Sequence, residues 1–181
     1  MDKDQEIAMV TDCQNGNREA LEKLVKQMQK PIYNAAYRML GNPEAAADVT
    51  QTTFLKVFEN IQRFDPKYRL FSWTYRIAMN ESIDQLKRSN RLEPLQEMPA
   101  SDAASPQQQA ENSQLSNEVQ ATLMELSEEH RAVITLRHFS DCSYEDISGI
   151  LELPEKTVKS RLFSARQQMK TKLQQHGVFS S

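Results

Sequence analysis

The sequence predicts an all-α protein made of two small helical domains joined by a flexible linker. Apolar residues recur at helical spacing, and no alternation typical of strands is visible. The 181 residues suffice for two small domains, and four Gly and seven Pro fit a mostly helical chain. Residues 94–115 hold three Pro, three consecutive Gln and no Lys or Arg, too little apolar surface to offset the entropy of ordering. The predicted domains are therefore 1–93 and 116–181.

The first domain begins with successive helices. Asn17 is a candidate N-cap, and Pro31 is expected to interrupt the helix that follows it. The helical pattern resumes over 32–40 and stops at residues 41–43, where a C-terminal Gly, a capping Asn and a first-turn Pro separate two helices. The apolar stripe after Asn17 comprises Leu21, Leu24, Val25 and Met28.

A long helix is expected over about 44–60, followed by a loop. The Asp65-Pro66 pair is a turn signal and places this loop at 62–71. Ser72 is expected to cap the next helix, which runs to about Ser89. The side chains that the long helix and its end should bury are Val49, Phe54, Val57 and Ile61.

The second domain reads as a helix-turn-helix unit. Its first helix starts near Leu115, and Ser127 starts another. Residues 143–146, Ser-Tyr-Glu-Asp, form a capping box for a short helix that ends before Pro154. Thr157 is expected to cap a final helix that reaches about residue 173. A short helix, a tight turn and a second helix are the helix-turn-helix pattern.

The charges are placed unevenly along the chain. The formal net charge of −3 argues weakly against a nucleic-acid partner. Residues 63–91, however, carry seven Lys/Arg against three acids, and residues 156–172 carry six Lys/Arg and no acid. Residues 116–155 carry nine acids and two Lys/Arg. Two basic segments on an acidic background can neutralise phosphates while the rest of the chain repels DNA.

Several classes of protein are not indicated. No apolar run approaches the roughly 20 residues of a membrane span, and the N-terminus lacks a signal-peptide pattern, so we expect a cytoplasmic protein without membrane insertion. Cys13 and Cys142 form no Cys-x-x-Cys pair, and His138 with Cys142 supplies only two metal ligands. Phosphate-cradling, nucleophile-elbow and zinc-protease motifs are absent. We therefore expect no enzymatic activity, no cofactor and no metal.

Residues 63–80 interleave aromatic rings with cations. They hold five aromatic side chains, including the one Trp of the chain, and four Lys/Arg. This mixture suits a surface that holds unstacked bases. Helical phasing places Tyr75 and Met79 in the core and Trp73, Arg76 and Asn80 on the opposite side. Trp73 is then a wedge or a stacking platform for a base.

Structural alternatives stay open for two of these residues. Trp73 can instead pack against Phe54 or Phe58 of the preceding helix. Asn80 can hydrogen-bond a base edge, because its amide is both donor and acceptor, but an Asn that merely caps or bridges helices is common.

The final helix has two stripes by its helical period. The apolar stripe, which should face the core, comprises Val158, Leu162, Ala165, Met169 and Leu173. A second stripe about a quarter turn away holds Lys159, Phe163, Arg166 and Lys170. A ring among three cations suits a major groove, although a surface helix whose Phe packs on a neighbour would show the same pattern. The capping box and turn in front favour a recognition helix.

With these motifs the chain resembles the group 4, or extracytoplasmic-function (ECF), sigma factors of bacterial RNA polymerase. The resemblance to sigma region 2 rests on Tyr-Arg-Met-Leu-Gly at 37–41, Ala-Asp-Val-Thr-Gln at 47–51 and Phe-Ser-Trp-Thr-Tyr-Arg-Ile-Ala-x-Asn at 71–80. The resemblance to sigma region 4 rests on Leu126-x4-Arg131-x-Val133, residues 143–147 and Pro-x2-Thr-Val-Lys-Ser-Arg-Leu-x2-Ala-Arg at 154–166. No recognisable region 3 lies between them.

The resemblance implies partners and roles for particular residues. It implies binding to core RNA polymerase, at the clamp helices of the largest subunit and at the flap, together with promoter DNA and an anti-sigma factor. The implied core-polymerase contacts are Asp48, Gln51, Thr52 and Leu55. Those implied for minus-10 recognition and melting are Arg63, Lys67, Trp73, Arg76 and Asn80. Those implied for minus-35 recognition are Lys159, Ser160, Arg161, Phe163 and Arg166.

Five positions depart from the family pattern. Thr52 stands where Glu is usual, and Thr74 replaces a common Leu. Glu152 and Lys156 replace usual turn glycines, and Ser164 replaces a frequent Arg of the recognition helix. A turn Gly often supplies a positive φ, so the first of these glycine replacements predicts strain or a different turn.

A second reading from another class is a stand-alone transcriptional regulator. In it, residues 116–181 bind DNA and residues 1–93 form a partner or sensor domain. This reading explains the helix-turn-helix pattern but gives the aromatic and basic run at 63–80 no function. An enzymatic reading lacks a candidate site.

Overall fold

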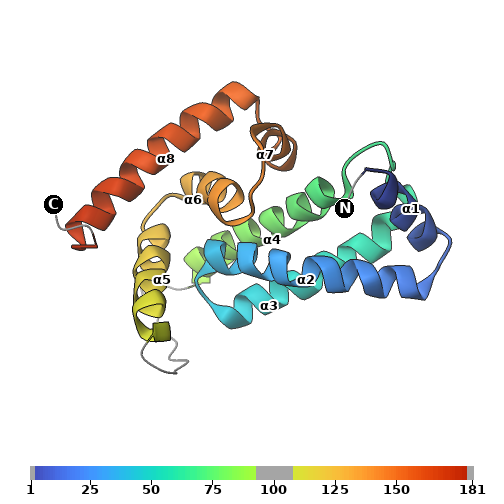
Figure 1. Cartoon of the computed structure of the whole chain (residues 1–181), viewed down its shortest axis with the longest axis horizontal. Coiled ribbons are helices and arrows are strands. Elements are labelled where there is room, and N and C mark those ends of the chain that lie inside the picture. The colour runs from blue at the N-terminus through green and yellow to red at the C-terminus, as the bar shows by residue number, and fades with distance from the viewer. Residues whose placement is uncertain (1–2, 93–107, 179–181) are drawn as a thin grey trace.

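The computed structural model describes residues 3–92 and 108–178, and every regular element in these two ranges is a helix. Helices α2, α3 and α4 pack lengthwise, α1 crosses one end of them, and α5 stands at the other end (Figure 1). Helices α6 and α7 lie along one side, with α8 beyond them. The elements are α1 (Lys3–Gln14), α2 (Arg18–Leu40), α3 (Pro43–Asn60), a 3₁₀ turn η1 (Ile61–Arg63), α4 (Leu70–Leu92), α5 (Gln108–Met124), α6 (Glu128–Ile134), a π turn η2 (Thr135–Phe139), α7 (Tyr144–Leu151) and α8 (Glu155–Gln175).

Helix α2 begins as predicted but is not interrupted at Pro31. The side chain of Asn17 accepts hydrogen bonds from the N–H groups of the first turn, at 3.0 and 3.3 Å. Pro31 lies on the exposed side of the helix, and the helix continues through it. A mid-helix Pro removes one hydrogen bond and crowds the preceding turn, at a cost of about 3 kcal/mol. Leu24, Met28 and Ile32 are buried on both sides of it, and burial of such side chains offsets that cost.

The junction between α2 and α3 follows the sequence closely. Gly41 has φ 67° and ends α2 in the left-handed region, and the side chain of Asn42 caps α3 by accepting from Ala45 N–H at 2.9 Å. A Cβ on Gly41 would lie 2.7 Å from Met124 Sδ, so α5 packs closely against this turn. All four side chains expected in the core at α3 and its end are buried.

Helix α4 begins at Leu70, so Ser72 lies inside its first turn and is not the cap that the sequence predicted. The carboxylate of Glu6, on α1, takes the capping role: its Oε1 accepts from Phe71 N–H at 2.9 Å. Glu6 is only 4% exposed and lies 65 positions before Phe71, so local sequence reasoning could not find this cap. Tyr75 and Met79 are buried, as phasing predicted.

The C-terminal half contains the predicted caps, with one exception. Ser127 caps α6, and Ser143 and Asp146 form the capping box of α7. Helix α8 starts at Glu155 after Pro154, so Thr157 is inside the helix and does not cap it; a Pro before the first turn already fixes the entry of the chain. Helix α5 starts at Gln108, inside the segment predicted as a linker, in a stretch of good helix formers. Residues 93–107 lie outside the described residues, so the domain boundaries stay a prediction.

The two halves share one core and touch at two places. Their buried apolar side chains form one connected cluster. At the first place, Arg131 of α6 is buried and donates to the carbonyls of Met39, in α2, and of Leu123, Met124 and Leu126, at 2.6 to 3.0 Å. Burial lowers the pKa of this guanidinium. At the second place, α7 lies across α4 (Figure 1).

Candidate nucleic-acid interface

A polar groove runs along the start of α4 and the loop before it, and one wall of it is α7. It encloses 1130 Å³. Of the residues predicted to meet minus-10 DNA, Arg63, Trp73 and Arg76 line this groove. Lys67 lies on the loop above it, and Asn80 is exposed about one helical turn beyond Arg76. The structure therefore gathers three of the five predicted residues in one groove and leaves the other two at its margins.

Trp73 is half-buried and stacks on a ring from the loop. Its ring centroid lies 4.7 Å from that of Phe64, with the planes tilted by 30°. Trp73 also packs against the hydrophobic core, so the structural alternative of a packed ring holds in part, with Phe64 as the ring partner. Phe64 is itself 8% exposed and fixes the indole at the groove wall.

The loop before α4 presents a cation and a ring to solvent. Lys67 N–H donates to Asp65 Oδ1 at 3.1 Å, and its Nζ lies 2.7 Å from Asp65 Oδ2. The hydrogen bond from the Lys67 side chain, and then that from its backbone, lowers the pKa of Asp65. In turn, the hydrogen bond to the Asp65 carboxylate, and then the charge of Asp65, raise the pKa of Lys67. Tyr68 is 65% exposed, and Lys67 Nζ lies 5.7 Å from its ring centroid.

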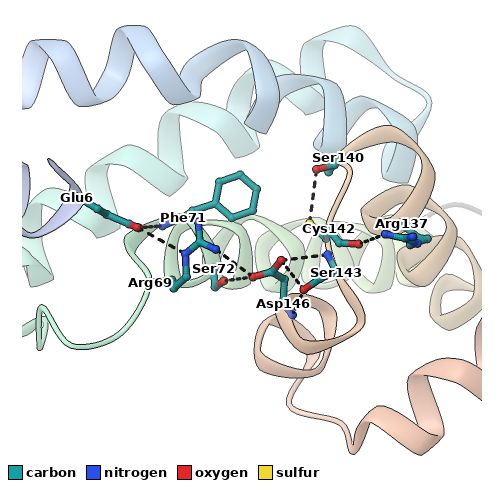
Figure 2. A network of polar contacts seen from close by, with 9 residues as sticks. All are labelled: Glu6, Arg69, Phe71, Ser72, Arg137, Ser140, Cys142, Ser143 and Asp146. Atoms are coloured by element: carbon teal, nitrogen blue, oxygen red, sulfur yellow. Dashed lines mark hydrogen bonds and ion pairs between the residues drawn. The ribbon is translucent and has the colours of Figure 1, made fainter. Parts of the chain in front are cut away.

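Two cations of this region meet polar groups of α7. Arg69 Nη1 lies 3.7 Å from Asp146 Oδ1, and Arg76 bonds both the carbonyl of Gly149 and the carboxylate of Glu152. Asp146 also accepts from Ser143 Oγ at 2.7 Å and from Ser143 N–H at 3.0 Å (Figure 2). Burial alone would raise the pKa of Asp146, but these two hydrogen bonds and Arg69 lower it. It therefore stays ionised at neutral pH.

The outer face of α8 carries the second predicted DNA surface. Lys159, Ser160 and Arg166 are exposed, and Phe163 is 66% exposed, so the alternative in which this ring packs on a neighbour does not hold within the described residues. Arg161 lies on another flank, half-buried, with its Nη2 3.4 Å from Glu129 Oε2 of α6. The apolar stripe faces inward as predicted: Val158, Leu162, Ala165 and Leu173 are buried and Met169 partly so.

Arg166 is positioned by a histidine that the sequence did not link to it. Its Nε donates to His138 Nε2 at 3.1 Å. Burial, and then the charges of Arg166 and Arg137, lower the pKa of His138, so the ring is neutral and can accept this bond.

Cys142 is buried, and burial, followed by the charges of Asp146 and Asp141, raises its pKa to about 12. Among the described residues, no group of three or more His, Cys, Asp or Glu is placed to hold a metal.

The residues predicted to contact core polymerase lie along one side of α3. Gln51 and Leu55 line an apolar groove of 770 Å³ between α2 and α3, and Leu55 is 54% exposed. Asp48 is exposed and Thr52 is half-buried on the same helix. The groove is completed by Val25, Tyr33, Phe54 and Phe58, with Lys26 and Lys30 at its edge. Such a groove suits an amphipathic helix.

Sequence reasoning missed several residues of the polar groove. Tyr68 and Arg69 belong to the aromatic and basic run, so their composition was a signal, but only the structure shows that they line the groove. The ring partner Phe64 was part of the same run. The contacts of α7 with α4 had no local signal, because 73 or more positions separate the partners.

Two family models match the chain, and they cover its two halves. Sigma-70 region 2 matches residues 24–92, and Sigma-70 region 4 matches residues 116–169. The first contains the α4 and loop side of the polar groove, and the second contains its α7 wall and the helix-turn-helix unit of α7 and α8. No helix in the described part of the chain is long and apolar enough to cross a membrane.

Individual relatives agree with the family models. The chain is 31% identical over 179 residues to the ECF RNA polymerase sigma-E factor of Haemophilus influenzae, covering 92% of this chain and 94% of the relative. It is 35% identical over 161 residues to the ECF RNA polymerase sigma factor SigE of Mycolicibacterium smegmatis, covering 86% of this chain but 62% of that longer relative. The chain belongs to the ECF sigma factors of the sigma-70 family.

A solved structure shows the same fold. The sigma factor RpoE of Bartonella quintana, in complex with the anti-sigma factor NepR, superposes with a TM-score of 0.66 at 23% identity. The match covers 84% of this chain and 96% of that chain.

Proposed function

We propose that the protein is a promoter-specificity factor: it binds core RNA polymerase and directs initiation through recognition of minus-10 and minus-35 elements. The observation that carries this proposal is the presence of two separate basic surfaces, one on α4 and its loop and one on α8, in a chain of the ECF sigma family. Two weak readers on one chain act together, because the first contact raises the effective concentration of the second.

Core polymerase binds at α3 in this proposal. Asp48, Gln51, Thr52 and Leu55 contact the clamp helices of the largest subunit, and region 4 contacts the flap. The apolar groove beside Leu55 supports the first contact, since an exposed Leu on a groove rim suits an amphipathic helix of a partner. The same apolar groove between α2 and α3 suits an anti-sigma factor that would compete with core polymerase for this face.

The polar groove holds the opened minus-10 strand. Trp73 offers a ring face for one base, braced from behind by Phe64. Arg63, Lys67 and Arg76 supply charge for the phosphates, and Asn80 can bond a base edge at the groove margin. This division of work follows the general rule that phosphate contacts position a strand while base contacts specify it.

Helix α8 enters the major groove of the minus-35 element. Lys159, Ser160, Phe163 and Arg166 lie on its exposed face and meet base edges and phosphates. Arg161 meets the phosphate backbone from its flank once its surface ion pair with Glu129 exchanges. RNA synthesis itself belongs to the polymerase core, which places this protein in the cytoplasm and gives it no catalytic step of its own.

Run-off transcription with purified core polymerase and a promoter library tests the proposal. We expect initiation from a subset of promoters that share minus-10 and minus-35 elements. A stand-alone regulator, the competing function, would support no initiation in this assay. Absence of transcripts from every library member, with a second sigma factor as positive control for the core enzyme, would reject the proposal.

A further inference from the structure

We propose that this chain shields its own minus-10 surface: the C-terminal end of α7 holds Arg76, and Glu152 supplies the carboxylate that a DNA phosphate must displace. The inference rests on the minus-10 role proposed for Arg76, and it adds an intramolecular competitor to that role. The competitor is the helix-turn-helix unit of the same chain.

The contact uses three nitrogens of one guanidinium. Arg76 Nε and Nη2 donate to the carbonyl of Gly149 at 3.1 and 2.6 Å, and Nη1 lies 3.2 Å from Glu152 Oε1. Gly149 is in the last turn of α7, where carbonyls lack helical partners and the helix dipole is negative. A carbonyl and a carboxylate thus occupy the donors that would bind a phosphate bidentately.

A second contact holds the other end of α7. Asp146 Oδ1 lies 3.7 Å from Arg69 Nη1 and accepts from Ser72 Oγ at 3.5 Å. Figure 2 shows Arg69 between Glu6 of α1 and Asp146 of α7. Acidic groups at both ends of α7 therefore face two cations of the polar groove, Arg69 and Arg76.

The backbone conformation at Glu152 is one that Gly adopts more easily, so the presence of Glu here favours a role for its carboxylate in the contact with Arg76. Glu152 ends α7 with φ 55° and ψ 44°, in the left-handed region where Gly or Asn is favoured. Gly would fit this conformation without strain but would offer no carboxylate to Arg76. The pair is solvent-exposed, with 39% of the Arg76 side chain and 68% of the Glu152 side chain accessible. Such a pair is weak and screened by salt, so a DNA phosphate displaces this carboxylate readily.

The test uses the full chain and its single Trp. Trp73 lies in the shielded groove, so acrylamide quenching of its fluorescence reports how open the groove is. We compare Glu152→Gly and Glu152→Asn, which both suit the left-handed backbone and remove the charge. Both should raise quenching and should tighten binding of a short fluorescein-labelled oligothymidylate by about threefold to fivefold at low salt, the range of an exposed ion pair.

Glu145→Gln is the matched control. Glu145 is exposed in the first turn of α7, lines the same groove and makes no ion pair with any residue that the structure describes. Equal gains in the control would mean that general charge, rather than the contact with Arg76, limits binding, and would overturn the proposal. Unchanged quenching and affinity in both Glu152 variants would overturn it as well. Increased quenching without oligonucleotide binding in any variant would support the closure and reject the minus-10 function of the groove.

Discussion

At the level of single residues, Trp73 is the side chain on which the proposed minus-10 role of the polar groove most depends. Its indole stacks on Phe64 on one side, is half-buried, and lies three positions before Arg76. A ring that packing already holds in place loses little entropy when a base stacks on it. Packing on Phe64 therefore holds Trp73 in place, and the residue also lines the groove proposed to receive a base.

Replacing this ring tests the proposed role of Trp73 in promoter melting. We expect Trp73→Ala in the holoenzyme to retain promoter binding but to lose permanganate-reactive thymines near minus 10. Loss of the Trp73 ring should also lower the free energy of unfolding by about 2 kcal/mol, because its packing on Phe64 is removed. Phe71→Ala is a matched control, because Phe71 is half-buried on the same helix and stacks on Tyr75 at 4.5 Å outside the groove. Unchanged reactivity in a folded Trp73 variant would assign the ring to packing alone.

His138 adds a pH dependence to stability. Its pKa is lowered by burial and by Arg166 and Arg137, so the folded chain binds fewer protons than the unfolded chain below the ordinary value of 6.5. Stability should therefore fall as pH drops from about 7 to about 5, where the ring is forced to charge. Chemical denaturation at both pH values measures this, with His138→Gln as the comparison. An equal loss in both proteins would assign the effect to other groups.

At the level of elements, most caps were predictable, Ser72 and Thr157 being the exceptions, and the long-range contacts were not. Asn17, Gly41, Asn42, Ser127 and Ser143 all act where local chemistry placed them, because a cap depends on residues within one turn. Pro31 and Ser72 were misread, since burial around α2 and the carboxylate of Glu6 outweigh local preference there.

The same distinction applies to the candidate site. Phasing placed Trp73, Arg76 and Phe163 on outward faces, because the helical period is a local property. The partners of these side chains on other elements depend on tertiary packing. Thus Phe64 behind Trp73, His138 beside Arg166 and α7 across Arg76 became visible only in the fold.

The exposed face of α8 makes a prediction for minus-35 selectivity. Lys159 is exposed, with its Nζ 5.5 Å from the Tyr144 ring centroid and 3.7 Å from Glu155 Oε2, so its truncation removes little packing. We expect Lys159→Ala in the holoenzyme to cost about 1 to 3 kcal/mol of discrimination between matched and scrambled minus-35 sequences, measured by competition binding. Equal losses on both sequences would make Lys159 a phosphate contact only.

At the level of the whole molecule, two kinds of contact join the halves. Arg131 binds four carbonyls in a buried setting, an arrangement that is costly to break because the charge would be left unpaired. The contacts of Arg76 and Arg69 with α7 are exposed and weak. Releasing Arg76 and Arg69 from the polar groups of α7 is therefore easier than breaking the contacts of Arg131.

This arrangement predicts that the free protein binds promoter duplex poorly. Arg76 in the polar groove is held by α7, and residues 116–155 carry nine acids that repel DNA beside the exposed face of α8. In a gel shift at physiological salt, we expect the isolated chain to bind no tighter than about 10⁻⁶ M, the range of non-specific binding. Adding core polymerase should produce a sequence-specific complex, because both DNA-binding surfaces are then presented together. Tight and sequence-specific binding by the chain alone would contradict the prediction, and a scrambled promoter of equal length controls for charge.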